Sequence, residues 1–351
     1  MPLALLTGAT GFVGGAVLRE LLARGWGVRV LHRPGSPQRN LEGLGAPFER
    51  WIGDLRDLAS LREAAAGCDF VFHVAARYQF GLGYSRAMYR DNVEGTCNVL
   101  AAAAAARVRR IVYTSTVGVL HARADGVPVD EACLASIEQL AGPYKRSKWL
   151  AEQEVLRAAR EGLPVVTVCP SAPVGPCDVK PTPTGKMILD FVRGRMPAYV
   201  DTGLNLVAVE DAAVGHVLAA ERGEVGQRYI LGHENLSFRA ILEMLSSITG
   251  RSPPRLRVPR RLLVPLSYVS EGVSLVLRRA PAISLENARM AQSYMYFDCS
   301  RAVRELGFSP GSVRRALERA VDWFEENGYV SRRPLSTGPS RNGRGAREAV
   351  G

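Results

Sequence analysis

The stretch TGATGFVGG, residues 7–15, carries the clearest structural signal in this chain of 351 residues. It follows a short apolar run and opens an amphipathic stretch, so the pattern predicts a strand, a glycine turn and a helix. In such a turn the first glycine permits the tight bend, the second lets a pyrophosphate approach, and the third lets helix pack on strand. The helix then offers its first N–H groups to phosphate oxygens. The turn predicts a dinucleotide site contacted by Thr7, Gly8, Thr10, Gly11, Phe12, Val13 and Gly14.

Short apolar runs alternate with helical patterns on both sides of this turn. Strands are predicted over residues 3–6, 28–31, 48–52, 70–75, 110–116 and 165–169, and helices near 13–24, 57–66, 87–106 and 143–161. Such alternation indicates βαβ units and a parallel sheet covered on both faces. The expected fold class is α/β: a Rossmann-type doubly wound parallel sheet over residues 1–172.

The character of the sequence changes after Pro170, where residues 173–185 are dense in proline and glycine. Mixed elements follow: helices near 185–194, from Glu210-Asp211, near 237–249 and near 312–327, and strands at 206–209 and 228–231. We expect a smaller C-terminal substrate-binding lobe over residues 173–330, with some later segments returning to the first domain. Residues 331–351 hold five arginines against one glutamate and few apolar residues, which predicts a disordered basic tail.

The formal net charge is +11, and arginines cluster in one further place. Arg251, Arg255, Arg257, Arg260, Arg261, Arg278 and Arg279 flank the apolar run 262–277. This cluster is compatible with a solvated face or with peripheral contact to an anionic membrane. No nucleic-acid motif accompanies it, so no nucleic-acid partner is predicted.

Targeting and metal-binding signals are absent from the sequence. The start, MPLALLTGATG, lacks a basic region, and no apolar stretch reaches the length of a membrane span, which predicts a cytoplasmic protein. The six cysteines form no CxxC pair, and His216 and His233 have no partners at ligand spacing. Free thiols and no metal are expected.

The end of the second strand bears on cofactor choice. VRVLHRP, residues 28–34, has Arg33 where an acid would bind a ribose 2′-hydroxyl. Arg33 could pair with a 2′-phosphate, which favours NADP(H), although a solvated Arg33 and NAD(H) remain compatible. Asp54 and Leu55 follow the third strand, where an acid can accept from an adenine amino group, and Asp57 could be a helix N-cap.

The segment YKRSK, residues 144–148, places Tyr144 and Lys148 four positions apart, on one face of a predicted helix. An ammonium group and an oxidised nicotinamide would stabilise a phenolate, so we expect the pKa of Tyr144 to be lowered. Tyr144 could then exchange a proton with a substrate oxygen. Thr116, in YTST (113–116), could hold the same oxygen, with Ser115 beside it.

The glycine turn, HVAA (73–76), DNVEGT (91–96), YTST and YxxxK, in this order, resemble the extended short-chain dehydrogenase/reductase family over residues 3 to about 330. The resemblance implies a catalytic set of Thr116, Tyr144 and Lys148, with Lys148 also bonding the nicotinamide ribose. It implies a supporting role for Asn92 and cofactor contacts at Ala75, Ala76, Asn92, Thr114, Tyr144, Lys148 and Pro170.

The second half resembles a narrower group within that family. Residues 180–216 and RYILGHENLS (228–237) are similar to hopanoid-associated sugar epimerases, which in turn resemble dihydroflavonol 4-reductases. The resemblance implies a sugar epimerase of hopanoid metabolism. The missing acid after the second strand keeps open an NADPH-dependent carbonyl reductase, and a non-catalytic dinucleotide sensor is disfavoured because Tyr144 and Lys148 are both present. The implied partner is a small molecule (a sugar, sugar nucleotide, ketone or alcohol), a homodimer is compatible, and the candidate substrate residues are Arg77, Tyr78, Tyr199 and Asn205.

Overall fold

The computed structural model describes residues 1–78, 85–277 and 285–330. The predicted basic tail and two arginines of the cluster, Arg278 and Arg279, lie outside the described residues.

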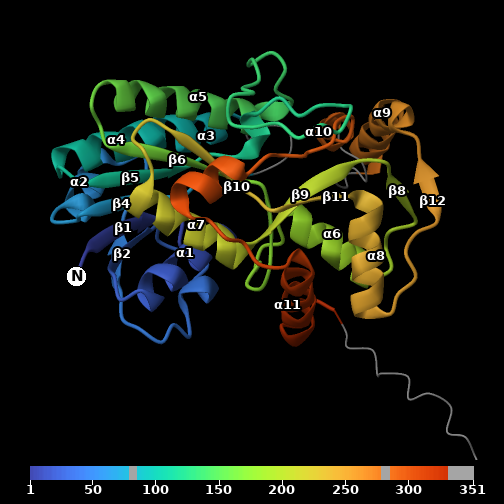
Figure 1. Cartoon of the computed structure of the whole chain (residues 1–351), viewed down its shortest axis with the longest axis horizontal. Helices are drawn as coiled ribbons and strands as arrows, with labels where there is room; N and C mark the ends of the chain where they lie inside the picture. Colours follow the sequence, from blue (N-terminus) through green and yellow to red (C-terminus); the bar gives the residue numbers. More distant parts are fainter. Residues whose placement is uncertain (79–84, 278–284, 331–351) are drawn as a thin grey trace, which may run out of the picture.

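A seven-stranded sheet forms the centre of the molecule, with the order β10-β6-β5-β4-β1-β2-β3 (Figure 1). Every pairing in it is parallel. The strands are β1 (Leu3–Thr7), β2 (Gly27–His32), β3 (Glu49–Ile52), β4 (Phe70–His73), β5 (Arg110–Thr114), β6 (Val165–Pro170) and β10 (Arg228–Leu231). The predicted Rossmann-type α/β fold is confirmed.

Two helical layers cover this sheet (Figure 1). One face carries α1 (Phe12–Ala23) and α7 (Val209–Arg222), and the other carries α2 (Leu58–Ala65), α4 (Gly95–Ala105) and α5 (Gly142–Arg160). Strand β1 is apolar at successive positions because helices cover both faces of the sheet. Leu6 packs into the cluster beneath α1 and α7, whereas Leu5 packs into the opposite cluster. A strand buried on both faces needs apolar residues at successive positions.

Two predicted elements differ from the structure near the site. The helix predicted over 87–106 is α3 (Ser85–Tyr89), one turn of π-helix (Arg90–Glu94) and α4. The strand predicted over 110–116 ends at Thr114, and Thr116 caps a short 3-10 turn, Val117–Val119. The π-helical turn buries Asp91 and Asn92 together, and such turns are frequent at functional sites.

The lobe contains two small sheets that the sequence did not predict, β11-β9-β7 and β12-β8. Helices α6, α8 and α11 pack against the first of these around a separate apolar cluster. The later segments that return to the first domain are α7, which packs on α1, and β10, which pairs with β6. The lobe elements are β7 (Ala172–Val174), α6 (Pro183–Val192), β8 (Ala198–Val200), β9 (Gly203–Ala208), β11 (Glu234–Ser237), α8 (Phe238–Thr249), β12 (Leu256–Val258) and α11 (Val313–Glu326).

Helix α9 (Arg260–Leu277) lies at the far end of the lobe beside α10 (Leu285–Met290) (Figure 1). Among the helices that the structure describes, none combines the length and the apolar character needed to cross a membrane.

Candidate active site

The glycine turn joins β1 to α1, and each of its three glycines has a separate structural reason. Gly8 has φ +83°, and a Cβ there would lie 2.6 Å from the Ala75 nitrogen. A Cβ on Gly14 would lie 2.1 Å from the Gly8 carbonyl oxygen, so only glycine allows this close contact between turn and helix.

Gly11 is the position that leaves space for a ligand. A Cβ there would meet only the Gly8 oxygen, at 3.3 Å, and no side chain caps the N-terminus of α1 at this residue. An exposed, uncapped helix N-terminus beside a glycine fits a pyrophosphate group. Of the other turn residues, Phe12 is buried, and Thr10 and Val13 are half-buried.

A series of buried hydrogen bonds holds the start of this turn in place. The Thr7 hydroxyl donates to Nδ1 of His73 (2.8 Å), and Nε2 of His73 donates to the Thr96 hydroxyl (3.0 Å), whose own proton goes to the Asn92 carbonyl (2.6 Å). This arrangement requires a neutral imidazole, and burial lowers the pKa of His73 to about 3. The Asn40 amide also donates to the Thr10 and Gly11 carbonyls (3.2 and 3.1 Å), a support that the sequence did not predict.

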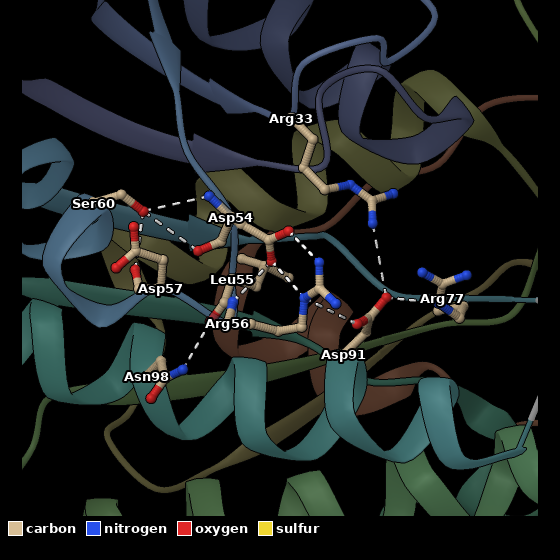
Figure 2. Close-up of polar contacts among 9 residues, drawn as sticks. All are labelled: Arg33, Asp54, Leu55, Arg56, Asp57, Ser60, Arg77, Asp91 and Asn98. Carbon is tan, nitrogen blue, oxygen red and sulfur yellow. Dashed lines mark hydrogen bonds and ion pairs between the residues drawn. The ribbon is translucent and has the colours of Figure 1, made fainter.

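Arg33, Arg56 and Arg77 gather around Asp91 beyond the ends of β2, β3 and β4 (Figure 2), on the side where the adenosine half of a dinucleotide would lie. Arg33 follows β2 and is half-exposed, with one guanidinium nitrogen 3.9 Å from the Asp91 carboxylate. Arg56 bonds the Asp54 carboxylate at 2.7 Å and approaches Asp91 at 3.8 Å. The hydrogen bond from Arg56 is the main cause that lowers the pKa of Asp54 to about 2.

Asp91 is the common partner of these arginines, and the sequence did not single it out. Its Oδ2 accepts from Nε of Arg77 at 2.6 Å, so guanidinium groups from three different loops meet at one carboxylate (Figure 2). Asp57, in contrast, accepts from the Ala59 N–H and caps α2, which confirms that alternative for this residue. Leu55 is half-buried, and its carbonyl accepts from the Asn98 amide (2.9 Å).

Asn92 connects the loop after β4 to the helix that carries Tyr144. Its amide oxygen accepts from the Arg77 N–H (2.7 Å), and its amide nitrogen donates to the Arg77 carbonyl (3.1 Å) and the Ser147 hydroxyl (2.9 Å). The side chain is buried, so the structure places it as a support rather than on the surface of the groove. The same loop brings Tyr78 against Tyr144, with ring centroids 4.4 Å apart in an edge-to-face arrangement. Ala75 is half-buried and Ala76 is exposed in this loop.

Tyr144 lies in the first turn of α5 and Lys148 one turn later. The Lys148 ammonium donates to the Thr114 carbonyl (2.7 Å) and lies 4.3 Å from the centre of the Tyr113 ring. Burial lowers the pKa of Lys148 to about 8, with an opposing contribution from Glu152. Burial also raises the pKa of Tyr144 to about 12, opposite to the lowering expected from the sequence, because desolvation dominates in the protein alone.

The two neighbouring hydroxyls after β5 point to different surroundings. The Ser115 hydroxyl is buried and donates to Glu152, which forms a buried ion pair with Arg228. The Thr116 hydroxyl is half-buried and accepts from the Gly118 N–H (3.0 Å), which leaves its own proton without an acceptor among the described residues. Of these two hydroxyls, the Thr116 hydroxyl is therefore the one whose proton is not used within the described structure.

Several predicted contacts lie elsewhere. The Thr114 hydroxyl bonds Nε2 of His216 (2.9 Å), so only its carbonyl reaches Lys148, and Pro170 is buried at the end of β6. Tyr199 is half-buried in β8 and packs on the core of the lobe. Asn205 is 1% exposed and bonded to Asn235 (2.8 Å) and to the His233 N–H (2.9 Å), so this placement does not support the expected substrate contact.

Comparisons with known proteins agree with the fold and the order of these motifs. The model of the NAD dependent epimerase/dehydratase family matches residues 4–232. The putative dihydroflavonol 4-reductase of Synechocystis sp. is 47% identical over 329 residues, which cover 93% of this chain and 95% of that protein. Sterol demethylase protein B of Methylococcus capsulatus is 36% identical over 328 residues, which cover 93% of this chain and 99% of that protein.

Among solved structures, gox2253 superposes with a TM-score of 0.83 at 46% identity and covers 93% of this chain and 99% of that chain. The glycine turn, the sheet order and the order of the motifs along the chain thus have the same explanation. This chain belongs to the NAD-dependent epimerase/dehydratase family, extended short-chain oxidoreductases and epimerases that bind a nicotinamide dinucleotide.

Proposed function

We propose that this protein is an NADP(H)-dependent carbonyl reductase of the dihydroflavonol 4-reductase type. The observation that carries the proposal is the adenosine end of the groove, where β2 is followed by Arg33 rather than by an acid and Arg56 lies close by. Two guanidinium groups favour a 2′-phosphate, and NADPH is the usual reductant of biosynthetic reductases. The similarity to the putative dihydroflavonol 4-reductase supports the same reading.

The residues at the other end of the groove suit proton donation to a carbonyl oxygen. With its pKa raised to about 12, Tyr144 keeps its proton at neutral pH and can give it to the oxygen as that atom gains charge. The free proton of the Thr116 hydroxyl can hold the same oxygen. When bound, the reduced nicotinamide supplies the hydride that the carbonyl carbon accepts.

Lys148 would stabilise the phenolate that remains on Tyr144 until solvent returns a proton. Its pKa of about 8 keeps most of the ammonium charged at neutral pH. Its fixed bond to the Thr114 carbonyl holds it one helical turn from the phenol. The set Thr116, Tyr144 and Lys148 is thus proposed as the catalytic group, with Tyr78 at the border of the substrate space. The Arg77 side chain is bonded to Asp91 at the adenosine end, which does not support the substrate contact expected of it from the sequence.

A sugar epimerase is the second candidate, because residues 180–216 of the lobe carry the resemblance to hopanoid-associated sugar epimerases. Such an enzyme would use the same three residues but would oxidise and re-reduce its substrate without net consumption of cofactor. The link to hopanoid metabolism stays a prediction.

The two candidates are separated by the balance of cofactor. The purified protein is incubated with NADPH, NADH or their oxidised forms and with a panel of ketones, dihydroflavonols and sugar nucleotides, and both cofactor absorbance and products are followed. A reductase oxidises one NADPH for each alcohol formed and works more slowly with NADH. Interconversion of two sugar nucleotides with unchanged cofactor absorbance would contradict the proposal and support the epimerase.

A further inference from the structure

The first part of helix α9, residues 260–270, contacts the lobe through a few side chains. Leu263 and Ser267, one turn apart, are buried beneath it. At its start, the Arg260 guanidinium lies 4.4 Å from the centre of the Tyr294 ring and donates to the Gln292 carbonyl (3.2 Å). The start of the helix is therefore held to the lobe, and the opposite side of residues 260–270 is exposed.

That opposite side is apolar. Five of the twelve large hydrophobic side chains that are markedly exposed in the described parts of the chain lie within residues 256–269. Soluble proteins usually expose such side chains singly, and a contiguous group marks a surface that contacts something. We call this group the α9 face; it consists of Leu262 (46% exposed), Leu266 (42%), Tyr268 (57%) and Val269 (65%) in α9, together with Leu256 (64%) in β12, the strand just before it.

Positive charge borders the α9 face. Residues 251–270 contain five arginines and no aspartate or glutamate. Arg257 pairs with Asp201, whereas Arg255 and Arg261 are exposed and make no ion pair with any residue that the structure describes. An apolar helix face with arginines at its edge is the arrangement of helices that lie in a membrane interface.

We propose that the α9 face rests on the surface of a membrane rich in anionic lipid. Leu262, Leu266 and Val269 enter the boundary between headgroups and acyl chains, and Arg255 and Arg261 meet the lipid phosphates. A second copy of the chain fits less well, because a symmetric contact would bring the same arginines of both copies together without acidic partners in the segment.

The position of the α9 face in the lobe suggests what membrane contact would do for the protein. Strand β12, which carries Leu256, pairs with β8, and Arg257 lies opposite Tyr199 in that pairing. The face therefore belongs to the lobe that the sequence predicts to bind the substrate, so contact with the membrane would place that lobe beside lipophilic substrates.

Vesicle co-sedimentation of the full chain tests the proposal. At low salt, the protein should sediment with vesicles of phosphatidylglycerol and phosphatidylcholine and remain in solution with phosphatidylcholine alone. Because each arginine near an anionic surface contributes about 1 kcal/mol, the double variant Arg255→Gln/Arg261→Gln should bind roughly 30-fold more weakly. Leu262→Ser/Leu266→Ser should lose binding by about tenfold or more, since each buried CH₂ contributes roughly 0.8 kcal/mol.

The matched control is Val303→Ser/Arg304→Gln, which removes one exposed apolar side chain (49% exposed) and one exposed arginine from a different part of the molecule. This variant should bind as the wild type does. NADPH binding and melting temperature, measured on every variant, show that the fold is intact. Residues 331–351 are unchanged throughout, so binding through them would appear as equal binding of all variants.

Three results would overturn the proposal. The wild type could fail to bind the anionic vesicles, or both α9-face variants could bind as well as the wild type. Light scattering could instead show a dimer that Leu262→Ser/Leu266→Ser converts to monomers, which would make the face a contact between copies of this chain.

Discussion

The two ends of the proposed cofactor site are built differently. At the catalytic end, Lys148 is 2% exposed and Asn92 is 1% exposed, and each makes short bonds to neighbouring groups (2.7 Å from Lys148 to the Thr114 carbonyl). At the adenosine end, the Arg33 and Arg56 side chains are 51% and 44% exposed and approach Asp91 only at 3.9 and 3.8 Å. At the catalytic end, hydrogen bonds hold the side chains in place in the protein alone. At the adenosine end, the longer contacts of Arg33 and Arg56 with Asp91 could be replaced by contacts with a ligand.

Removal of the phenol proton tests the catalytic end with the largest expected effect. In Tyr144→Phe the ring and its contact with Tyr78 remain, so NADPH should bind normally while turnover falls by about two orders of magnitude or more. Steady-state kinetics and fluorescence titration measure the two quantities. The matched control is Tyr113→Phe, since the Tyr113 hydroxyl has no hydrogen-bond partner in the described structure. Near-normal turnover of Tyr144→Phe would show that this tyrosine is not the acid.

The buried ion pair behind the catalytic end tests its rigidity. Glu152→Ala leaves the Arg228 guanidinium buried without its partner, which should cost about 3–5 kcal/mol of unfolding free energy in urea. The double variant Glu152→Leu/Arg228→Met replaces both charges by apolar groups and should lose less than the single variant. A single variant as stable as the wild type would mean that solvent reaches the pair.

Arg33→Ala tests the adenosine end. A charge-assisted contact contributes about 1.5–3 kcal/mol, so the NADPH dissociation constant should rise by roughly one to two orders of magnitude, with little change for NADH. Arg109→Ala is the matched control, because Arg109 pairs with Asp69 (3.3 Å), which bonds the Leu3 N–H rather than any residue of the site. Equal weakening of both cofactors, or a wild type that prefers NADH, would favour an NAD-retaining epimerase.

Acidification should separate the two ends by the pH at which each loses stability. His73 and His216 have pKa values lowered by burial to about 3 and about 4, so they stay neutral in the fold while the unfolded chain takes up protons below pH 6.5. Stability therefore falls as the pH drops from 6.5, by about 2 kcal/mol for each histidine at pH 5. Asp54, with its pKa lowered to about 2, loses its contribution only below its ordinary value of 3.8.

Chemical denaturation at several pH values checks this order. His216→Gln should flatten the slope between pH 6.5 and 5, because one of the two groups that differ in proton binding is gone. An unchanged slope would show that His216 already carries a proton in the fold.

What the sequence predicted is local along the chain. The glycine turn, the alternation of strands and helices, and the spacing of Tyr144 and Lys148 each depend on residues a few positions apart. Arg33 likewise follows directly after β2, which ends at His32, as the sequence predicted.

What the sequence missed depends on residues far apart or on burial. Glu152 meets Arg228 across 76 positions, and Asp91 gathers arginines from three loops. The lowered pKa expected for Tyr144 beside Lys148 and an oxidised nicotinamide stays a prediction; in the protein alone burial raises this pKa, and desolvation depends on packing that no local pattern contains. Asn205 has the chemistry of a substrate ligand, but the structure places it in hydrogen bonds among β9, β11 and the segment at Phe297.

The position of β10 has a consequence for how this chain is made. β10 completes the central sheet beside β6, yet it follows β6 only after the chain has passed through β7, α6, β8, β9 and α7. During synthesis the edge of β6 must therefore wait, unpaired, until residue 231 has emerged, and exposed strand edges invite association with other chains. Ribosome-bound chains that stop before Arg228 should consequently depend more on chaperones than those that extend past Leu231.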